Sequence, residues 1–515
     1  MAAIMRAVLS MSAINALSRT TGYLRTMVMA SVLGTGAVAN AYGASNGIAN
    51  LIYELFLGGI LYSAFIPLLV ERITAHGEED ARRLTNAVLT LILPSLAAVA
   101  LLGIVFAEPV VNFATRFQGS TELSPDEAQK TTELSVFFFG LGSVLTGVLN
   151  AHRRFVLPTF GPVLNNLFAV ACFGGYALLV PKNPTAAVYL LAATTFGVAL
   201  TALILLPPAW RLGYKIRPVF GHPSLLPAVR LAIPVLVFTA GSLGVQFVGL
   251  LLSSSFGAVA QLGYAFVVFS LPYGVFVLAI ETATMPELSE RHTREDTEGY
   301  RDTLSFGLRT MAFIVVPSSV GLVAFAEPIT GLLYERGNFT AEDTDLVASI
   351  LAAYSVGLLV YSAYFLLVRA FYSRQNTKIP ALLNLVFFGF YAAFAYLLSS
   401  IMGVIGVALA LSGTNAVFAL VCLAAMRREI GSVGGRLLLR SLFKILVAGT
   451  IMYAVAWGGM ALLGEGSNAL ERGGILIVAG GASLATYLGT AFLLKVEELK
   501  SATALLRRRV AEAED

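Results

Sequence analysis

The first feature that indicates the fold is the run "MRAVLSMSAINALSRTTGYLRTMVMASVLG", residues Met5–Gly34. Beyond Arg6, its only charged residues are Arg19 and Arg25, inside the stretch "SRTTGYLR". A helix needs about 20 mainly apolar residues to cross a bilayer. The run therefore predicts a membrane-spanning helix that carries two arginines in its middle.

The composition extends this prediction to the whole chain. Of the 515 residues, 57% are hydrophobic and 12% are charged, and the mean hydropathy is +0.80. A soluble domain carries about 25% charged residues. Long apolar runs recur from end to end, and the short alternating segments of a β-barrel do not appear. We expect an all-α polytopic membrane protein.

Runs of suitable length and apolarity predict about fourteen transmembrane helices. Their approximate spans are 5–33, 40–70, 84–107, 133–151, 156–180, 185–210, 227–253, 259–289, 304–326, 346–372, 377–400, 402–426, 441–463 and 473–495.

The distribution of Lys and Arg predicts the orientation. With the N-terminus inside, 27 of the 34 basic residues fall in cytoplasmic segments. Five fall in external loops, and the other two are Arg19 and Arg25. Short loops with excess Lys and Arg stay on the cytoplasmic side. We therefore expect both termini in the cytoplasm.

Two segments of the chain repeat each other at an offset of 219 residues. After the second predicted helix comes "IPLLVERITAHGEEDARR", and after the eighth comes "MPELSERHTREDTEGYRD". Charged loop residues match as well, so shared apolar composition does not explain the similarity. Pro67, Glu71, Arg72, Thr74, Glu79 and Arg82 correspond to Pro286, Glu290, Arg291, Thr293, Glu298 and Arg301.

A duplication of six helices gives two lobes of the same orientation, a parallel repeat. We expect an N-lobe over residues 1–218 and a C-lobe over 219–430. Helices 13 and 14 occupy 431–495, and a charged cytoplasmic tail occupies 496–515. In such repeats the substrate site lies near the midplane, where the lobes meet, and rocking of the lobes gives alternating access.

Three interpretations of Arg19 and Arg25 remain open. Arg25 could snorkel to the external interface, or the pair could form a structural ion pair with Glu54 in the second predicted helix. Otherwise they bind an anionic substrate, because guanidinium groups match phosphate oxygens in bidentate geometry. The last two interpretations are compatible if the substrate competes with Glu54.

Other residues are candidates for coupling or gating. Glu281, in the eighth predicted helix, is either a proton or cation site or a carboxyl near the basic cytoplasmic end; we favour the second. Gly58, Gly59 and Pro272 allow helices to bend. Arg153, Arg154, Arg374 and Lys378 form a predicted cytoplasmic rim, although setting the topology explains most of them.

The sequence lacks the motifs of several kinds of binding and catalytic site. The two cysteines lie in separate predicted helices and the four histidines in separate loops, so we expect no metal site. Nucleotide-binding and nucleophile motifs are missing. We expect no enzyme activity, no cofactor and no nucleic-acid partner, and transport driven by a gradient or the membrane potential.

The residues around the arginines resemble a known family. "ALSRTTGYLRTMVMASVLGTGAVANAY" and "NLIYELFLGGILYSAFIPLLVER" look like the opening of the MurJ (MviN) family of lipid II flippases. This family belongs to the multidrug/oligosaccharidyl-lipid/polysaccharide exporter superfamily. The resemblance covers all fourteen helices, and the "YELFLGG" form is similar to the actinobacterial branch.

This resemblance implies a cationic central cavity and a groove, shaped by helices 13 and 14, for a polyprenyl tail. The implied substrate is undecaprenyl-diphosphate-linked peptidoglycan precursor, moved to the outer leaflet of the bacterial plasma membrane. Membrane lipids and cell-wall synthesis enzymes are the implied partners. The residues implied to bind substrate are Ser18, Arg19, Arg25, Asn40, Asn50 and Glu54.

The sequence also departs from the family pattern. Relatives often have arginine where this chain has Tyr53, and an Asp-Arg pair where it has Phe266 and Val267. Phe388 replaces an acid of the sodium site that some relatives have near Asn384. Three rival functions therefore remain: a flippase for another polyprenyl-diphosphate glycan, a drug or cation antiporter, and a scaffold for cell-wall enzymes.

Overall fold

The computed structural model is helical wherever it assigns regular structure. It describes residues 2–54, 65–105, 125–152, 154, 156–179, 184–215, 217–464, 466 and 468–499. These residues contain helices, turns and loops but no strand, which confirms the predicted all-α class. Gly58, Gly59, Arg153 and most of the tail lie outside the described residues.

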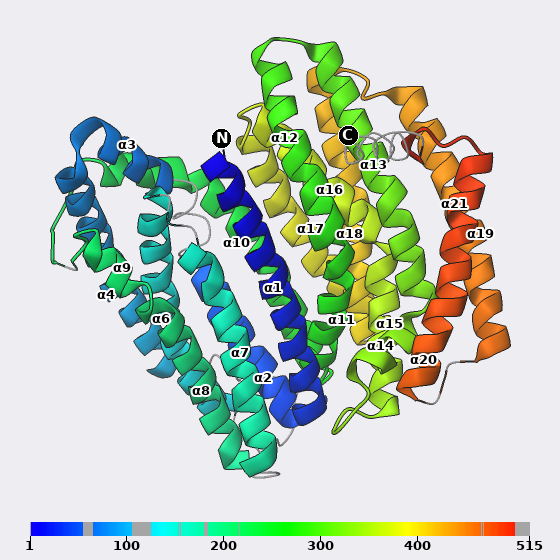
Figure 1. Cartoon of the computed structure of the whole chain (residues 1–515), viewed down its shortest axis with the longest axis horizontal. Helices are drawn as coiled ribbons and strands as arrows, with labels where there is room; N and C mark the ends of the chain where they lie inside the picture. Colours follow the sequence, from blue (N-terminus) through cyan, green and yellow to red (C-terminus); the bar gives the residue numbers. More distant parts are fainter. Residues whose placement is uncertain are drawn as a thin grey trace. The chain divides into compact units, whose positions relative to one another are not determined.

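The chain divides into two compact units. Unit 1 comprises residues 1–260 and 336–339, and unit 2 comprises 261–335 and 340–515. The helices of unit 1 are α1 (Ala2–Leu33), α2 (Ala37–Tyr53), α3 (Ile66–His76), α4 (Glu78–Val105), α6 (Pro125–Ala151), α7 (Val156–Leu179), α8 (Pro184–Leu203), α9 (Leu206–Arg211) and α10 (Leu225–Ser254) (Figure 1).

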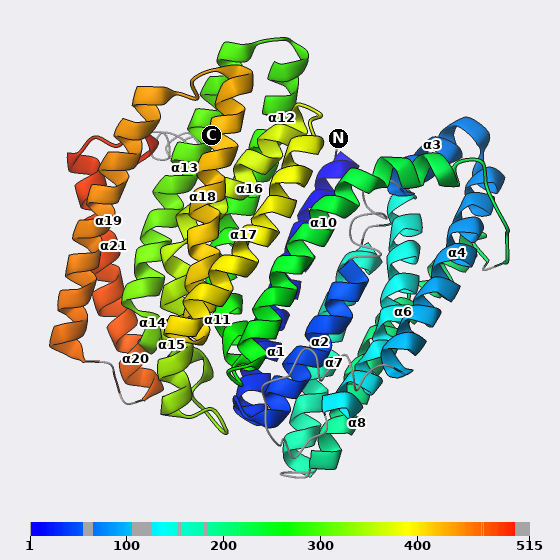
Figure 2. The same ribbon diagram turned by 180° about the vertical axis from the view of Figure 1, so that it is seen from behind.

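Unit 2 contains the remaining helices, and α11 begins two residues before the boundary. They are α11 (Val259–Pro272), η3 (Tyr273–Val277), α12 (Leu278–Thr293), α13 (Thr297–Ala324), α14 (Ala326–Tyr334), α15 (Ala341–Val356), α16 (Leu358–Ser373), α17 (Lys378–Met402), α18 (Val404–Ile430), α19 (Gly435–Leu463), α20 (Ala469–Ile475), η4 (Leu476–Gly480) and α21 (Gly481–Leu493). Within this unit, α19 and α21 run side by side (Figures 1 and 2).

Each of the fourteen predicted spans coincides with at least one helix. In the described part of the chain, ten helices are long and apolar enough to cross a membrane on their own. The pair α15 and α16 qualifies as one further span with a 48° bend. The total of fourteen is consistent with these findings, and α10 clusters with unit 1 because it packs on α2.

Two predicted spans are interrupted. A π-helical turn, η3, follows Pro272 inside the eighth span. Proline lacks the N–H that would continue the α-helical ladder, and single π-turns often occur at functional sites. The tenth span bends at Gly357, where a Cβ atom would lie 2.3 Å from the Ser412 hydroxyl of α18. The break at Gly357 therefore permits a close approach of two helices.

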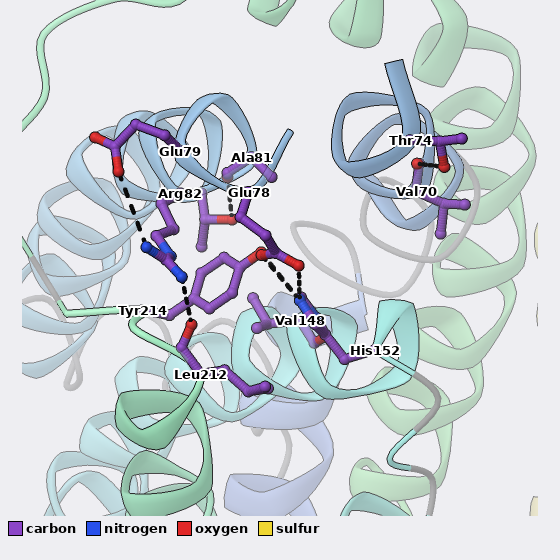
Figure 3. Close-up of polar contacts among 11 residues, drawn as sticks. Val70, Thr74, Glu78, Glu79, Ala81, Arg82, Val148, His152, Leu212 and Tyr214 are labelled. Atoms are coloured by element: carbon purple, nitrogen blue, oxygen red, sulfur yellow. Dashed lines mark hydrogen bonds and ion pairs between the residues drawn. The ribbon is translucent and has the colours of Figure 1, made fainter. Parts of the chain in front are cut away.

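The internal repeat is visible in the helix boundaries. Helix α4 covers 78–105 and α13 covers 297–324, so both ends differ by 219, the offset of the sequence repeat. Each copy also carries the same interaction. Arg82 donates to the carbonyl of Leu212 at 3.1 Å (Figure 3), and its counterpart Arg301 donates to the carbonyl of Ile430.

These carbonyls stand where the last helix of each six-helix repeat ends. Gly213 and Gly431 follow them with φ of 85° and 81°, and each glycine lies against the arginine of its own copy. Positive φ is readily available only to glycine. The two arginines thus satisfy carbonyls left free at a helix C-terminus, where positive charge is favourable. This shared device supports the predicted duplication.

Candidate functional site

Arg19 and Arg25 lie in the middle of α1, an unbroken helix of 32 residues. Arg19 is exposed and Arg25 is half-buried. Among the residues that the structure describes, neither guanidinium forms an ion pair, and Nε of Arg25 is buried without a hydrogen-bond partner. Their separation of six residues corresponds to a rise of about 9 Å. The structure thus holds two positive charges that no described carboxylate neutralises.

The orientation of α1 is fixed by α7. Nδ2 of Asn166 donates to the carbonyl of Ser18 at 3.1 Å and to the hydroxyl of Thr21 at 3.3 Å. Ser18 therefore contributes its backbone carbonyl, which binds α1 to α7 next to Arg19. The sequence analysis missed Asn166. Its only signal in the sequence is that two adjacent asparagines, Asn165 and Asn166, occur inside an apolar span.

Asn40 is fully engaged by the backbone around it. Its Nδ2 donates to the carbonyls of Thr35 and Gly36, and to that of Gly257 at 2.7 Å. Its Oδ1 accepts from the amide of Ala260 at 3.0 Å. The side chain is 8% exposed. This geometry supports a structural role, joining α2 to the turn before α11, over the implied role in substrate binding.

Glu54 and Asn50 lie at the end of α2. Asn50 is exposed, and Glu54 is half-buried with Gln246 of α10 near its carboxylate. No ion pair connects Glu54 to Arg19 or Arg25, all three of which the structure describes. The arrangement therefore does not support Glu54 as their structural counterion.

Glu281 forms a different polar cluster, in unit 2. Its side chain is 2% exposed, and Oε2 lies 3.5 Å from Nε of Arg369 in α16. The hydroxyl of Tyr273 donates to both carboxylate oxygens, at 3.3 and 3.4 Å. Arg369 lies inside the tenth predicted span, 346–372, and α16 includes it and ends at Ser373. A buried carboxylate thus has a specific cationic partner on a neighbouring helix.

The predicted cytoplasmic rim is only partly available for a ligand. Arg154 and Lys378 are exposed. Arg374 instead pairs with Glu429 at 3.1 Å and lies 5.5 Å from the centre of the Tyr300 ring. These contacts favour a structural role for Arg374.

A second polar network lies in unit 1, on the side that the sequence predicts to be cytoplasmic. Glu78 at the start of α4 accepts from Nε2 of His152 at 3.2 Å and from the hydroxyl of Tyr214 at 3.4 Å (Figure 3). Burial and the adjacent Glu78 carboxylate raise the pKa of Tyr214 above its ordinary value. A neutral tyrosine remains a hydrogen-bond donor, so this network tethers α4, α6 and the segment after α9.

Comparison of the helix arrangement with solved structures defines the fold class of the chain. A solved structure described as lipid II flippase MurJ, inward closed conformation, matches with a TM-score of 0.79 and 22% identity over 94% of this chain and 98% of that one. A multidrug resistance MATE family transporter of the MOP superfamily matches with a TM-score of 0.59 and 16% identity, over 82% and 95% of the two chains. The chain has the fold of this superfamily of transporters.

The particular family follows from the sequence comparison. The family model described as "Lipid II flippase MurJ" matches residues 29–467, and the chain belongs to this family. Lipid II flippase MurJ of Burkholderia cenocepacia is 29% identical over 73% of this chain and 74% of its own length. A probable lipid II flippase MurJ of Vibrio cholerae is 28% identical over 96% and 97%. The chain is a multi-pass bacterial inner membrane protein.

Proposed function

We propose that this chain moves lipid II, the undecaprenyl-diphosphate-linked peptidoglycan precursor, from the inner to the outer leaflet by alternating access. The observation that carries the proposal is the pair Arg19 and Arg25 in a chain of the MurJ family: two charges inside a predicted membrane span that no described carboxylate neutralises. An arginine at the centre of a membrane helix costs roughly 2.5–3.5 kcal/mol on insertion scales. Such a cost is offset when the side chains meet water and an anionic ligand.

The chemistry of the substrate fits these side chains. A diphosphate cannot enter hydrocarbon unaided, and Arg pairs with phosphate oxygens through two parallel hydrogen bonds. In this proposal Arg19 and Arg25 neutralise the diphosphate while the polyprenyl tail stays in lipid. The reaction is transport without covalent chemistry, with both termini in the cytoplasm. Because backbone groups engage the side chain of Asn40, the arginines carry the recognition in this proposal.

A depletion–rescue experiment tests the proposal. The gene is expressed in cells depleted of their own lipid II flippase, and lipid II in the outer leaflet is measured. We expect the wild type to restore it and Arg19→Ala and Arg25→Ala to abolish the rescue. Arg428→Ala, which removes an exposed arginine at the end of α18, serves as the matched control and should retain it. Rescue by both α1 variants would contradict the proposal and favour a scaffold.

One observation favours a second candidate substrate. Tyr53, Phe266 and Val267 stand where relatives often carry charged residues, so the positive charge that meets the substrate differs from theirs. A flippase for another polyprenyl-diphosphate-linked glycan would show the same dependence on Arg19 and Arg25. It would fail to restore lipid II externalisation and would restore that of its own glycan instead.

A further inference from the structure

We infer that Arg369 is an additional binding residue for the diphosphate of the lipid substrate, and that Glu281 is its counterion until the substrate arrives. The inference rests on the proposed function and extends it to unit 2. In the same unit, Phe266 and Val267 of α11 carry no charge. Arg369 supplies a positive charge from α16 instead.

The first support is the geometry of the ion pair. Nε of Arg369 lies 3.5 Å from Glu281, longer than the 2.7–2.9 Å of a well-formed charge-assisted hydrogen bond. For comparison, Arg309 lies 2.9 Å from Glu498 in the same unit. The Arg369 pair is therefore loose, and an anion can replace Glu281 without breaking a short hydrogen bond.

The second support is the unused end of the guanidinium. The ion pair uses Nε, and within the described residues no hydrogen bond involves the two terminal nitrogens of Arg369. The side chain is 44% exposed, whereas that of Glu281 is 2% exposed. The nitrogens that bind phosphate in bidentate fashion are thus the part left for a ligand.

The third support is that Glu281 is held from its other side. The hydroxyl of Tyr273 donates to both oxygens of Glu281, and Tyr273 itself packs against the rings of Tyr361 and Phe365 on α16. These contacts keep the carboxylate in place when Arg369 turns toward a ligand. Tyr273 begins the π-helical turn η3, which explains why this tyrosine and Glu281 face each other across eight residues.

The position of Arg369 along α16 indicates when the contact forms. Arg369 lies about one turn before the helix ends at Ser373, which the predicted orientation places on the cytoplasmic side. The diphosphate of a substrate in the inner leaflet lies at that depth. Arg369 would therefore bind the substrate at entry, before translocation.

The test measures binding to the full-length purified protein in detergent. The probes are undecaprenyl diphosphate, undecaprenol and inorganic pyrophosphate. We expect Arg369→Gln to weaken binding of undecaprenyl diphosphate about tenfold, the value of one charge-assisted hydrogen bond. Glu281→Gln should tighten it severalfold, because it releases Arg369. A purely structural ion pair predicts that neither substitution tightens binding, and that result would overturn the inference.

Removing one partner of a buried pair can unfold a protein, so a double variant is needed. Glu281→Gln with Arg369→Gln leaves no unpaired charge and should bind undecaprenyl diphosphate about tenfold more weakly than Glu281→Gln alone. Binding of undecaprenol should be the same in all variants. An effect confined to inorganic pyrophosphate would overturn the assignment to a lipid headgroup.

Arg428→Ala is again the matched control and should leave lipid binding unchanged. The outcomes also separate this inference from the proposed function. If the binding pattern holds but depletion–rescue fails, the substrate is another diphosphate lipid and the Arg369 site stands. If rescue succeeds but both substitutions leave binding unchanged, the chain is a lipid II flippase in which Arg369 has no such role.

Discussion

At the scale of single residues, Asn40 shows how a side chain that resembles a ligand-binding group can be structural. All of its hydrogen-bonding atoms are engaged with backbone groups, including those of Gly257 and Ala260. Asparagine provides two donors and a carbonyl acceptor, so it can bridge a free carbonyl and a free amide at once. The junction between α2 and the start of α11 uses both.

A substitution distinguishes the two roles of Asn40. Asn40→Ala should lower the free energy of unfolding by about 1–3 kcal/mol, because buried backbone groups lose their partners. The loss is measured by thermal or denaturant unfolding of the purified protein. Asn46→Ala, which removes a single bond to the backbone of its own helix, is the control and should cost less. An unchanged melting temperature combined with lost lipid binding would instead favour the substrate-binding role.

The sequence predicted Arg19 and Arg25 as candidate substrate-binding residues because a charged residue inside an apolar run can be recognised without a structure. It could not reveal Asn166, since a neutral amide in a membrane helix gives no periodic signal. Arg369 lies inside the tenth predicted span, but the sequence does not show which residue it contacts. Only packing shows that it pairs with a buried carboxylate.

At the scale of helices, each span predicted from hydropathy overlaps a helix, whereas the breaks depended on contacts. Pro272 indicated a weak point, and the π-turn η3 follows it. The bend at Gly357 arises because Ser412 of α18 occupies the space that a side chain would need. A contact between residues so far apart in sequence cannot be read from local composition.

The repeated arginines allow a prediction at this scale. Arg82→Ala and Arg301→Ala should each destabilise the protein by about 1 kcal/mol, because each frees a carbonyl at a helix C-terminus. Unfolding of the purified variants, or hydrogen exchange at residues 205–212 and 423–430, provides the measurement. Arg83→Ala is the control, since Arg83 is 67% exposed and pairs with Glu79 on the surface of α4. Similar losses in Arg83→Ala would argue against a capping role.

At the scale of the whole molecule, we propose that the membrane potential acts on the charge of the substrate to set the direction of transport. The diphosphate and the peptide carboxylates of lipid II are negative, and the cell interior is negative. Moving net negative charge outward gains about 2.3 kcal/mol per elementary charge per 100 mV, roughly a fiftyfold change in an equilibrium constant. No nucleotide-binding motif occurs in the sequence, which makes the potential the simplest available driving force.

The last prediction follows from this sign. Collapsing the potential with valinomycin at high external potassium should lower the amount of lipid II in the outer leaflet, measured in cells that depend on this chain. Nigericin removes the pH gradient without removing the potential, so it should have little effect. The reverse pattern would indicate proton coupling, and buried Glu281 would then be the first carboxylate to test.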